Sequence, residues 1–251
     1  MKTIAISGKG GTGKTTTAAM IIRWLADNRS KSILAVDADS TVSLNDMLGI
    51  AVPETVGAVR EEMKRLVNDL PGGMTKQQFL DYKIQSGLVE TPEFDLLAMG
   101  RPEGPGCYCY ANNVLRDILD TLSKNYDYVV IDNEAGMEHL SRRTAQAIDY
   151  MLMVSDPIVR GIRTAGKISR LLEELHARVG ERYLILNRVI EPPSDALKAA
   201  IADEGLKHLG SLPQDDRLLS RDRAGEPIWE ALTCSSAYRA LGRIMKELMA
   251  R

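Results

Sequence analysis

Four residues near the amino terminus have the identity and spacing of a phosphate-binding loop. Within "GKGGTGKTT", Gly8, Gly13, Lys14 and Thr15 satisfy the pattern G-x-x-x-x-G-K-[ST]. Glycines allow backbone N–H groups to turn toward phosphate oxygens, and the positive end of a following helix adds to the attraction. We expect Lys14 to contact the β- and γ-phosphates and the Thr15 hydroxyl to bind Mg²⁺. The sequence therefore predicts a site for a nucleoside triphosphate and its magnesium ion.

A second lysine, Lys9, directly follows the first glycine of this loop. With it the loop resembles the deviant phosphate loop, KGGxGK[ST], of the SIMIBI class of nucleotide-dependent dimers. That class includes septum-site and partition ATPases, nitrogenase iron protein and metal-insertion ATPases. The resemblance implies a homodimer in which Lys9 reaches the phosphates of the other subunit and takes part in catalysis with Lys14. The loop residues expected to contact nucleotide are Gly8, Gly10, Gly11, Thr12, Gly13, Lys14, Thr15 and Thr16.

Acidic residues follow two apolar segments that we expect to be strands. Asp37 and Asp39, in "VDAD", resemble the switch I aspartates of the same class. Asp37 is expected near Mg²⁺, and Asp39 is expected to orient or deprotonate the attacking water as a catalytic residue. A turn or helix cap is the competing interpretation of this pair. Asp132, in "DYVVIDNEAG", resembles the aspartate that holds Mg²⁺ through water, and Gly136 completes the D-x-x-x-G of switch II.

Three later residues are candidates for contact with the nucleotide base. Asn187, in "LILNRV", follows a late apolar run, where proteins of the class use a side-chain amide against adenine. Pro213 and Gln214, in "LPQDD", fall where those proteins close the base pocket. A turn-forming asparagine is the alternative interpretation of Asn187. The predicted cofactors are therefore ATP or ADP with Mg²⁺.

Two of the three cysteines, Cys107 and Cys109, lie in the glycine- and proline-rich stretch "GRPEGPGCYCYANN". In extended backbone, residues two apart face the same way, so both thiols can face one ligand. Two small buried residues and a strained local disulfide are the alternatives. Zinc prefers four ligands, and a two-fold dimer would bring two thiols from each subunit together. We favour a metal site between two subunits.

Short apolar runs alternate with longer helical patterns along the whole chain. Strands are expected at 3–7, 32–37, 94–99, 127–132, 149–154, 182–189 and 208–213, and helices at 14–28, 111–124, 161–179 and 235–250. Continuous apolar runs are typical of strands covered on both faces. We predict an α/β fold of SIMIBI type: a single doubly wound domain, 1–251, with a mostly parallel sheet of about seven to eight strands flanked by helices. Residues 53–92 are expected to form a helical insertion.

Composition narrows the partners and the compartment. The 251 residues include 32 basic and 34 acidic side chains, a balance that argues against binding to DNA phosphates. No apolar run approaches the roughly 20 residues of a membrane-spanning helix, and "MKTIAISGKGG" is not a signal peptide. Three cysteines fit a reducing compartment. We therefore expect a cytoplasmic protein with no nucleic-acid or membrane partner.

Three longer stretches carry a closer resemblance. "MGRPEGPGCYCYANN", "DNEAGMEHLSRRT" and "VSDPIVRGIRTA" are similar to the nickel-insertion ATPases of the carbon monoxide dehydrogenase system, the CooC family, over essentially the whole chain. The resemblance implies an ATP-driven homodimer that holds Ni²⁺ or Zn²⁺ through Cys107 and Cys109 and matures the nickel–iron–sulfur cluster of carbon monoxide dehydrogenase. Related branches serve acetyl-CoA synthase. One departure is switch I, "DADSTVSLND", where many relatives have Pro-Asn after the aspartates.

Two other functions would use the same nucleotide residues. A positioning or partition ATPase would need a basic surface or a membrane-binding tail. An amphipathic pattern near the carboxy terminus includes Tyr238, Leu241, Ile244, Met245 and Leu248, although such a helix more often packs on its own domain. An iron–sulfur reductase like nitrogenase iron protein would use a cysteine near switch II, where this sequence has none. A surface or capping role is the default for His139, and a buried inert thiol is the default for Cys234.

Overall fold

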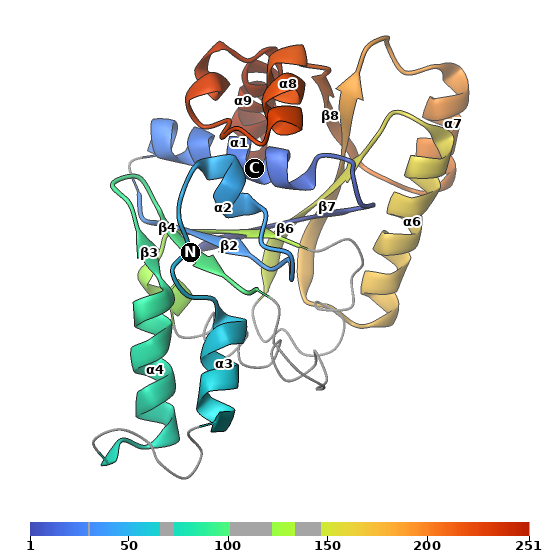
Figure 1. Ribbon diagram of the computed structural model, residues 1–251. Coiled ribbons are helices and arrows are strands. Elements are labelled where there is room, and N and C mark those ends of the chain that lie inside the picture. The colour runs from blue at the N-terminus through green and yellow to red at the C-terminus, as the bar shows by residue number, and fades with distance from the viewer. Residues whose placement is uncertain (30, 66–72, 101–121, 134–146, 251) are drawn as a thin grey trace.

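A computed structural model describes residues 1–29, 31–65, 73–100, 122–133 and 147–250 (Figure 1). Several predictions fall outside these residues and are not tested by the structure. They concern Cys107, Cys109, Gly136, His139 and most of the helix expected at 111–124.

A single eight-stranded sheet forms the centre of the described structure, in the order β3-β4-β2-β5-β1-β6-β7-β8. Every neighbouring pair is parallel except β3 and β4. This confirms the predicted doubly wound, mostly parallel sheet and adds the short β3, which the sequence did not predict. The strands are β1 (Lys2–Gly8), β2 (Ile33–Asp37), β3 (Val89–Glu90), β4 (Asp95–Ala98), β5 (Tyr128–Asp132), β6 (Ile148–Ser155), β7 (Val179–Val189) and β8 (His208–Pro213).

Helices follow most of the strands and confirm the expected alternation. They are α1 (Lys14–Arg29), α2 (Leu44–Leu48), α3 (Val56–Arg65), α4 (Lys76–Gly87), α6 (Val159–Glu174), α7 (Asp195–Asp203), α8 (Asp216–Ala224) and α9 (Ser236–Met249), with short 3₁₀ helices η2 (Ser123–Asn125) and η3 (Glu230–Cys234). The helix expected at 161–179 ends earlier, at Glu174. His176 adopts a left-handed conformation with φ 50 and donates its N–H to the Glu173 carbonyl, which ends the helix and turns the chain into β7.

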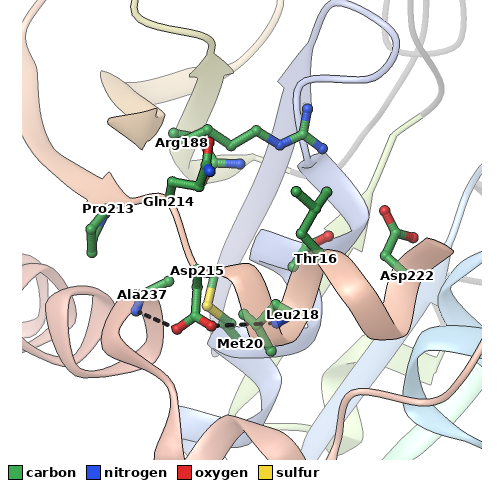
Figure 2. A pocket seen from close by; sticks show the side chains of 11 residues that line it. Thr16, Met20, Arg188, Pro213, Gln214, Asp215, Leu218, Asp222 and Ala237 are labelled. Carbon is green, nitrogen blue, oxygen red and sulfur yellow. Dashed lines mark hydrogen bonds between the residues drawn. The ribbon is translucent and has the colours of Figure 1, made fainter. Parts of the chain in front are cut away.

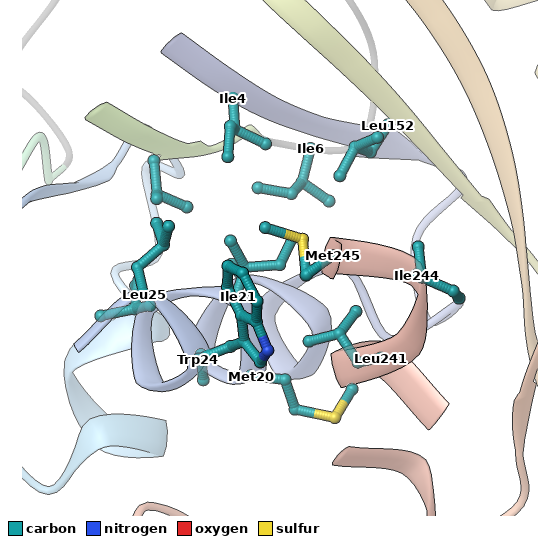
Figure 3. Packing of buried hydrophobic residues seen from close by; sticks show 14 of the residues in the cluster. Ile4, Ile6, Met20, Ile21, Trp24, Leu25, Leu152, Leu241, Ile244 and Met245 are labelled. Atoms are coloured by element: carbon teal, nitrogen blue, oxygen red, sulfur yellow. The ribbon is translucent and has the colours of Figure 1, made fainter. Parts of the chain in front are cut away.

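Two apolar cores lie on opposite faces of the sheet, because side chains alternate along each strand. Ile4 and Ile6 of β1 pack with α1 and α9, as Figure 3 shows, while Ala5 between them joins the core beneath α6 and α7. Ile4, Ala5 and Ile6 are all fully buried. A strand covered on both faces favours apolar residues on both sides, which is why the middle of β1, Ile4–Ala5–Ile6, is a continuous apolar run.

The carboxy-terminal helix α9 packs on its own domain. Leu241, Ile244, Met245 and Leu248 are buried in the same core as α1 (Figure 3), so the amphipathic pattern reflects internal packing. Tyr238 is partly buried, and its hydroxyl donates to Asp27 at the far end of α1, 2.7 Å away. Among the described helices, none is long and apolar enough to cross a membrane.

Residues 53–92 contain α3 and α4, as the predicted helical insertion requires, and these helices lie side by side (Figure 1). Lys83 of α4 pairs with Glu62 of α3 at 2.6 Å and with Glu54 at 3.2 Å. Whether the whole chain is one domain stays a prediction.

Candidate nucleotide site

The predicted phosphate loop lies between β1 and α1, at the carboxyl edge of the sheet. Gly8 ends β1 opposite Val154 of β6, and a Cβ at Gly8 would collide with the Val154 carbonyl. Gly13 has φ +87, and a Cβ there would collide with the amide nitrogen of Asn187. The first and last glycines of the motif are therefore required by close approach of other backbone and side-chain atoms.

The carbonyl groups of this loop are held by donors from the protein. The Lys9 carbonyl accepts from the Thr12 hydroxyl and the Gly13 carbonyl from the Thr17 hydroxyl, each at 2.8 Å. The Gly11 carbonyl accepts from Arg188 Nη1 and the Thr12 carbonyl from Asn187 Nδ2, also at 2.8 Å. A peptide group whose carbonyl is held on one side presents its N–H on the other. The Thr12 N–H is used within the loop, where it donates to the Lys9 carbonyl at 3.4 Å, and the bonding of the other carbonyls prepares the loop to direct N–H groups at an anion.

The two lysines of the loop lie in different environments. Lys14 is the first residue of α1 and is 8% exposed, whereas Lys9 is exposed. A buried ammonium at the positive end of a helix is stabilised when an anion binds beside it. An exposed lysine on the loop can reach a molecule outside its own subunit. These locations agree with the roles predicted for the two lysines, which the structure leaves untested.

Asp37 and Asp132 occupy paired positions at the ends of adjacent strands β2 and β5. Asp132 is 1% exposed, and neither of its carboxylate oxygens accepts a hydrogen bond of good geometry from the described part of the chain, although the Thr15 hydroxyl is near enough to affect its ionisation. Burial raises the pKa of Asp132 to about 7, and the negative charge of Asp37 adds to this, while the Thr15 hydroxyl and the Lys14 ammonium lower it. A buried carboxylate without a partner is unfavourable unless a cation joins it.

Asp37 is satisfied by backbone groups, in contrast to Asp132. Its carboxylate accepts the N–H groups of Asp39 (3.0 Å), Ser43 (2.8 Å) and Leu44 (2.8 Å), and so holds the start of α2. Burial raises the pKa of Asp37, with the charge of Asp39 adding to it, and the three N–H groups oppose the rise. The Asp37 carboxylate therefore connects the end of β2 to the predicted switch I loop and to the start of α2.

Asp39 closes a turn within the switch I loop. Its Oδ1 accepts both the backbone N–H (2.9 Å) and the hydroxyl (2.7 Å) of Thr41. The turn interpretation therefore describes Asp39 in this structure, and its predicted role toward water stays untested. Val42, three residues after Asp39, adopts φ 47, a conformation rare for a β-branched side chain.

The oxygen atoms around this point fit a magnesium ion. Mg²⁺ binds one or two carboxylates, keeps several waters and shares its remaining ligands with phosphate. The Asp37 and Asp132 carboxylates and the half-buried Thr15 hydroxyl supply such a set, and the orphaned oxygens of Asp132 leave room for the ion's charge. Within the described ranges, no group of three or more His, Cys, Asp or Glu side chains forms a metal site. The thiol site predicted for Ni²⁺ or Zn²⁺ falls outside those ranges.

The three residues predicted at the base line one pocket beside the phosphate loop (Figure 2). Asn187 is 7% exposed and donates to the Thr12 carbonyl, and Gln214 donates its backbone N–H to the Val189 carbonyl, 3.0 Å away. The pocket lies between the start of α1, the end of β7 and the turn from β8 into α8. Its lining residues are Thr16, Met20, Asn187, Arg188, Pro213, Gln214, Asp215, Leu218, Leu219, Asp222 and Ala237.

Arg188 was missed by the sequence reasoning. It adopts a left-handed conformation with φ 57, donates to the Gly11 carbonyl, and lies 4.0 Å from a carboxylate oxygen of Asp156. Non-glycine residues with positive φ are uncommon and gather at functional sites. No pattern in the sequence marks this residue, because the contact joins positions 177 apart.

Asp215 was also missed, although its place before the helical run "DRLLSRDRA" is a recognisable N-cap signal. Its Oδ1 accepts from the N–H groups of Arg217 and Leu218 in α8. Its Oδ2 accepts from the Ser235 hydroxyl and from Ser236 N–H at the start of α9 (Figure 2 shows the bonds to Leu218 and Ala237). One carboxylate therefore caps α8 and also holds the start of α9, where it binds Ser235, the N-cap of that helix, and the Ser236 N–H.

Replacing Asp215 by alanine is expected to lower the free energy of unfolding by about 2–3 kcal/mol, because each lost cap costs about 1 kcal/mol and buried donors lose their partner. Asp216→Ala removes the exposed neighbouring acid and is the control, with an expected loss of a few tenths of a kcal/mol. Urea denaturation measures both. Equal losses in the two variants would show that the double cap is not important.

The same carboxylate predicts a dependence on acid. Burial opposes ionisation of Asp215, but the Ser235 and Ser236 hydroxyls and the backbone N–H groups lower its pKa from 3.8 to about 2. A depressed folded-state pKa stabilises the protein above the unfolded value, and this stabilisation is lost as the pH falls from about 4 to 2. Urea denaturation at several pH values should show this loss of stability in the wild type, and Asp215→Ala should lack the part that Asp215 contributes.

Cys234 differs from its expectation as a buried thiol. It is a free, exposed cysteine at the end of η3. Leu232, two residues earlier, is fully buried and occupies the inward side of that turn. The thiol consequently faces solvent.

Comparison with known proteins identifies the family. Residues 3–228 match the model of the CobQ/CobB/MinD/ParA nucleotide binding domain. The chain belongs to this family. Like its relatives it is a nucleotide-binding ATPase, and membership implies ATP or ADP and Mg²⁺ as its ligands.

This CobQ/CobB/MinD/ParA-family ATPase is similar to two curated proteins and one solved structure that differ in their degree of identity. It is 43% identical to an uncharacterized ATP-binding protein of Methanocaldococcus jannaschii, covering 98% of each chain. It is 31% identical to the carbon monoxide dehydrogenase accessory protein CooC of Rhodospirillum rubrum, covering 88% of this chain and 87% of that protein. A crystal structure of a ParA family ATPase from Chlorobium tepidum shares the fold, with a TM-score of 0.72 at 19% identity over 96% of both chains.

Proposed function

We propose that this ATPase is a homodimeric metal carrier that binds Ni²⁺ or Zn²⁺ through Cys107 and Cys109 of both subunits. It would support nickel insertion into carbon monoxide dehydrogenase, with acetyl-CoA synthase as the other candidate client. The observation that supports this most is the 31% identity with the accessory protein CooC over 88% of the chain. The paired cysteines in "GPGCYCY" supply the chemistry that a metal carrier needs.

The nucleotide chemistry is assigned to the residues gathered at the carboxyl edge of the sheet. Lys14 and the loop N–H groups would hold the phosphates, while Thr15, Asp37 and Asp132 would hold Mg²⁺. The ion would neutralise the charge that develops on the phosphate oxygens. Asp39 would give up its turn with Thr41 and orient or deprotonate the attacking water. Exposed Lys9 would cross to the partner subunit.

The orientation of Asn187 supports adenine as the base. Its NH₂ group donates to the Thr12 carbonyl and the residue lines the pocket, so its carbonyl oxygen would be the acceptor for a bound base. An acceptor pairs with the exocyclic amino group of adenine and is repelled by the carbonyl that guanine has at that position. This favours ATP over GTP.

Coupling between nucleotide and metal follows from the link between Asp37 and the switch I loop. When ATP and Mg²⁺ engage Asp37, its hold on Ser43 and Leu44 changes the position of the loop and α2. In the proposed cycle, ATP in both subunits tightens the dimer and draws the four thiols together, and hydrolysis opens them. If ATP tightens metal binding, metal must tighten ATP binding by the same factor.

Metal stoichiometry tests the proposed carrier. We expect one Ni²⁺ or Zn²⁺ per dimer in the wild type and in Cys234→Ala, which removes the exposed thiol, and no bound ion in Cys107→Ala/Cys109→Ala. Light scattering without ligand, with Ni²⁺, with ATP and with both gives the oligomeric state. A non-hydrolysable ATP analogue should increase metal affinity. An ion that remains bound in the double variant would place the site elsewhere.

Neither alternative function gains support from the described residues. The apolar face of α9 is committed to the core, so it is not free to act as a lipid-binding tail. The visible absorbance spectrum tests the iron–sulfur reductase, because a bridging cluster would make the purified protein brown.

A further inference from the structure

Three cations form one exposed face on α6. Arg160, Arg163 and Lys167 follow each other at intervals of three and four residues, so they lie on the same side of the helix. All three are exposed, and none has an ion-pair partner among the residues that the structure describes. Arg170 continues the row but is paired with Glu204 at 2.6 Å. We call Arg160, Arg163 and Lys167 the basic face of α6.

Helix stability does not explain this arrangement. Arg160 lies in the first turn of α6, where the partial positive charge of the helix end makes a cation unfavourable by about 0.3–1 kcal/mol. Arg163 and Lys167 lie beyond that turn, and the helix end neither favours nor opposes them. α6 has no acidic residue in its first turn, Ile158 supplies no side-chain cap, and acidic Glu173 and Glu174 stand at the opposite end. Like charges three and four residues apart also repel each other. A charge pattern that opposes the stability of its own helix indicates a function outside it.

The basic face begins beside the phosphate loop. β6, which leads into α6, pairs Val154 with Gly8, and Asp156, the residue after β6, lies 4.0 Å from Arg188. Arg188 in turn donates to the Gly11 carbonyl of the loop. The start of α6 is therefore linked to the nucleotide site through two side chains. Ile158, 51% exposed, adds an apolar contact at the same end.

We propose that the basic face of α6, with Ile158, docks an acidic surface of a partner protein. This inference rests on the proposed function, in which that partner is the client enzyme. Arginine and large apolar residues together are typical of protein interfaces. A two-fold dimer centred on this face would bring like charges together, so the face does not dock on itself.

Charge and size argue against a nucleic acid as the occupant. The face extends over about 10 Å of helix and is followed by Glu173 and Glu174, which would repel a continuing phosphate backbone. The whole chain has a net charge of -2, so it provides no broad positive field around the face.

Charge reversal tests this proposal. The test variant is Arg160→Glu/Arg163→Glu/Lys167→Glu. The matched control is Arg239→Glu/Arg243→Glu/Lys246→Glu, which changes three exposed cations on α9 at a similar spacing and alters the net charge by the same amount. The probes are nickel-free carbon monoxide dehydrogenase, a short glutamate-rich peptide and a short DNA duplex. Calorimetry or light scattering at low and high salt measures binding, and circular dichroism and basal ATP hydrolysis establish that both variants are folded.

We expect the wild type and the α9 variant to bind the enzyme and the peptide, with affinity that falls as salt rises, and the α6 variant to bind at least about tenfold more weakly. Equal binding by both variants, or no binding of the peptide, overturns the docking face. Tighter α6-dependent binding of DNA than of peptide overturns the assignment to a protein. If the peptide binds through α6 but carbon monoxide dehydrogenase does not bind, the docking face stands and the proposed client is wrong.

Discussion

The variant Gly13→Ala is expected to bind an ATP analogue about 100-fold or more weakly than the wild type. The new Cβ would collide with the Asn187 amide, and Gly13 has φ +87, which is unfavourable for any other residue by about 1–2 kcal/mol. Moving Asn187 breaks its buried bond to the Thr12 carbonyl, at about 1–3 kcal/mol. Together these effects reach roughly 3 kcal/mol, which corresponds to a factor of about 100.

Gly11→Ala separates the steric contact from the backbone conformation. Gly11 has φ +80, similar to Gly13, but no atom lies within 4 Å of its would-be Cβ. Alanine there meets only the left-handed penalty, so a loss of about tenfold is expected. Titration with a fluorescent ATP analogue in the presence of Mg²⁺ measures both variants, and circular dichroism monitors folding. Equal losses would mean that contact with Asn187 does not shape the phosphate loop.

Asp132→Asn is expected to change activity and stability in opposite directions. ATP hydrolysis should fall by about 100-fold or more, because the variant loses a negative ligand of Mg²⁺ at the proposed site. The magnesium-free protein should become more stable by about 1 kcal/mol or more, because a buried carboxylate without a hydrogen-bond partner becomes a neutral amide. Such an exchange of stability for function is common at active sites.

Asp37→Asn is the matched control in the neighbouring strand. This variant should also lose hydrolysis, but its stability should fall by about 1–2 kcal/mol, since the carboxylate accepts three backbone N–H groups around α2. Denaturation without nucleotide or magnesium compares the two variants, and phosphate release measures hydrolysis. If both changes destabilise the protein equally, Asp132 has partners that this structure does not show, and our account of the magnesium site fails.

Local patterns in the sequence were sufficient to predict most of the fold. The strands were expected within a few residues because a strand covered on both faces favours consecutive apolar residues, as in the middle of β1 and of β6. The errors lie where local preference is overruled by distant partners. Residues 175–179 follow a helical pattern, but the left-handed turn at His176 and the pairing of Val179 with Ile148 place the end of this segment in β7.

The candidate site likewise has parts that local sequence patterns predict and parts that depend on distant contacts. The spacing of Gly8, Gly13, Lys14 and Thr15 was sufficient to predict a phosphate loop between β1 and α1, since backbone turns and a helix start depend on neighbours in the chain. Only the tertiary structure decided that Arg188 contacts Gly11, that Asp215 caps both α8 and α9, and that Asp132 is left without a partner among the described residues. Those properties arise where distant strands and helices meet, and the energy of a buried charge or a shared cap depends on what the fold places beside it.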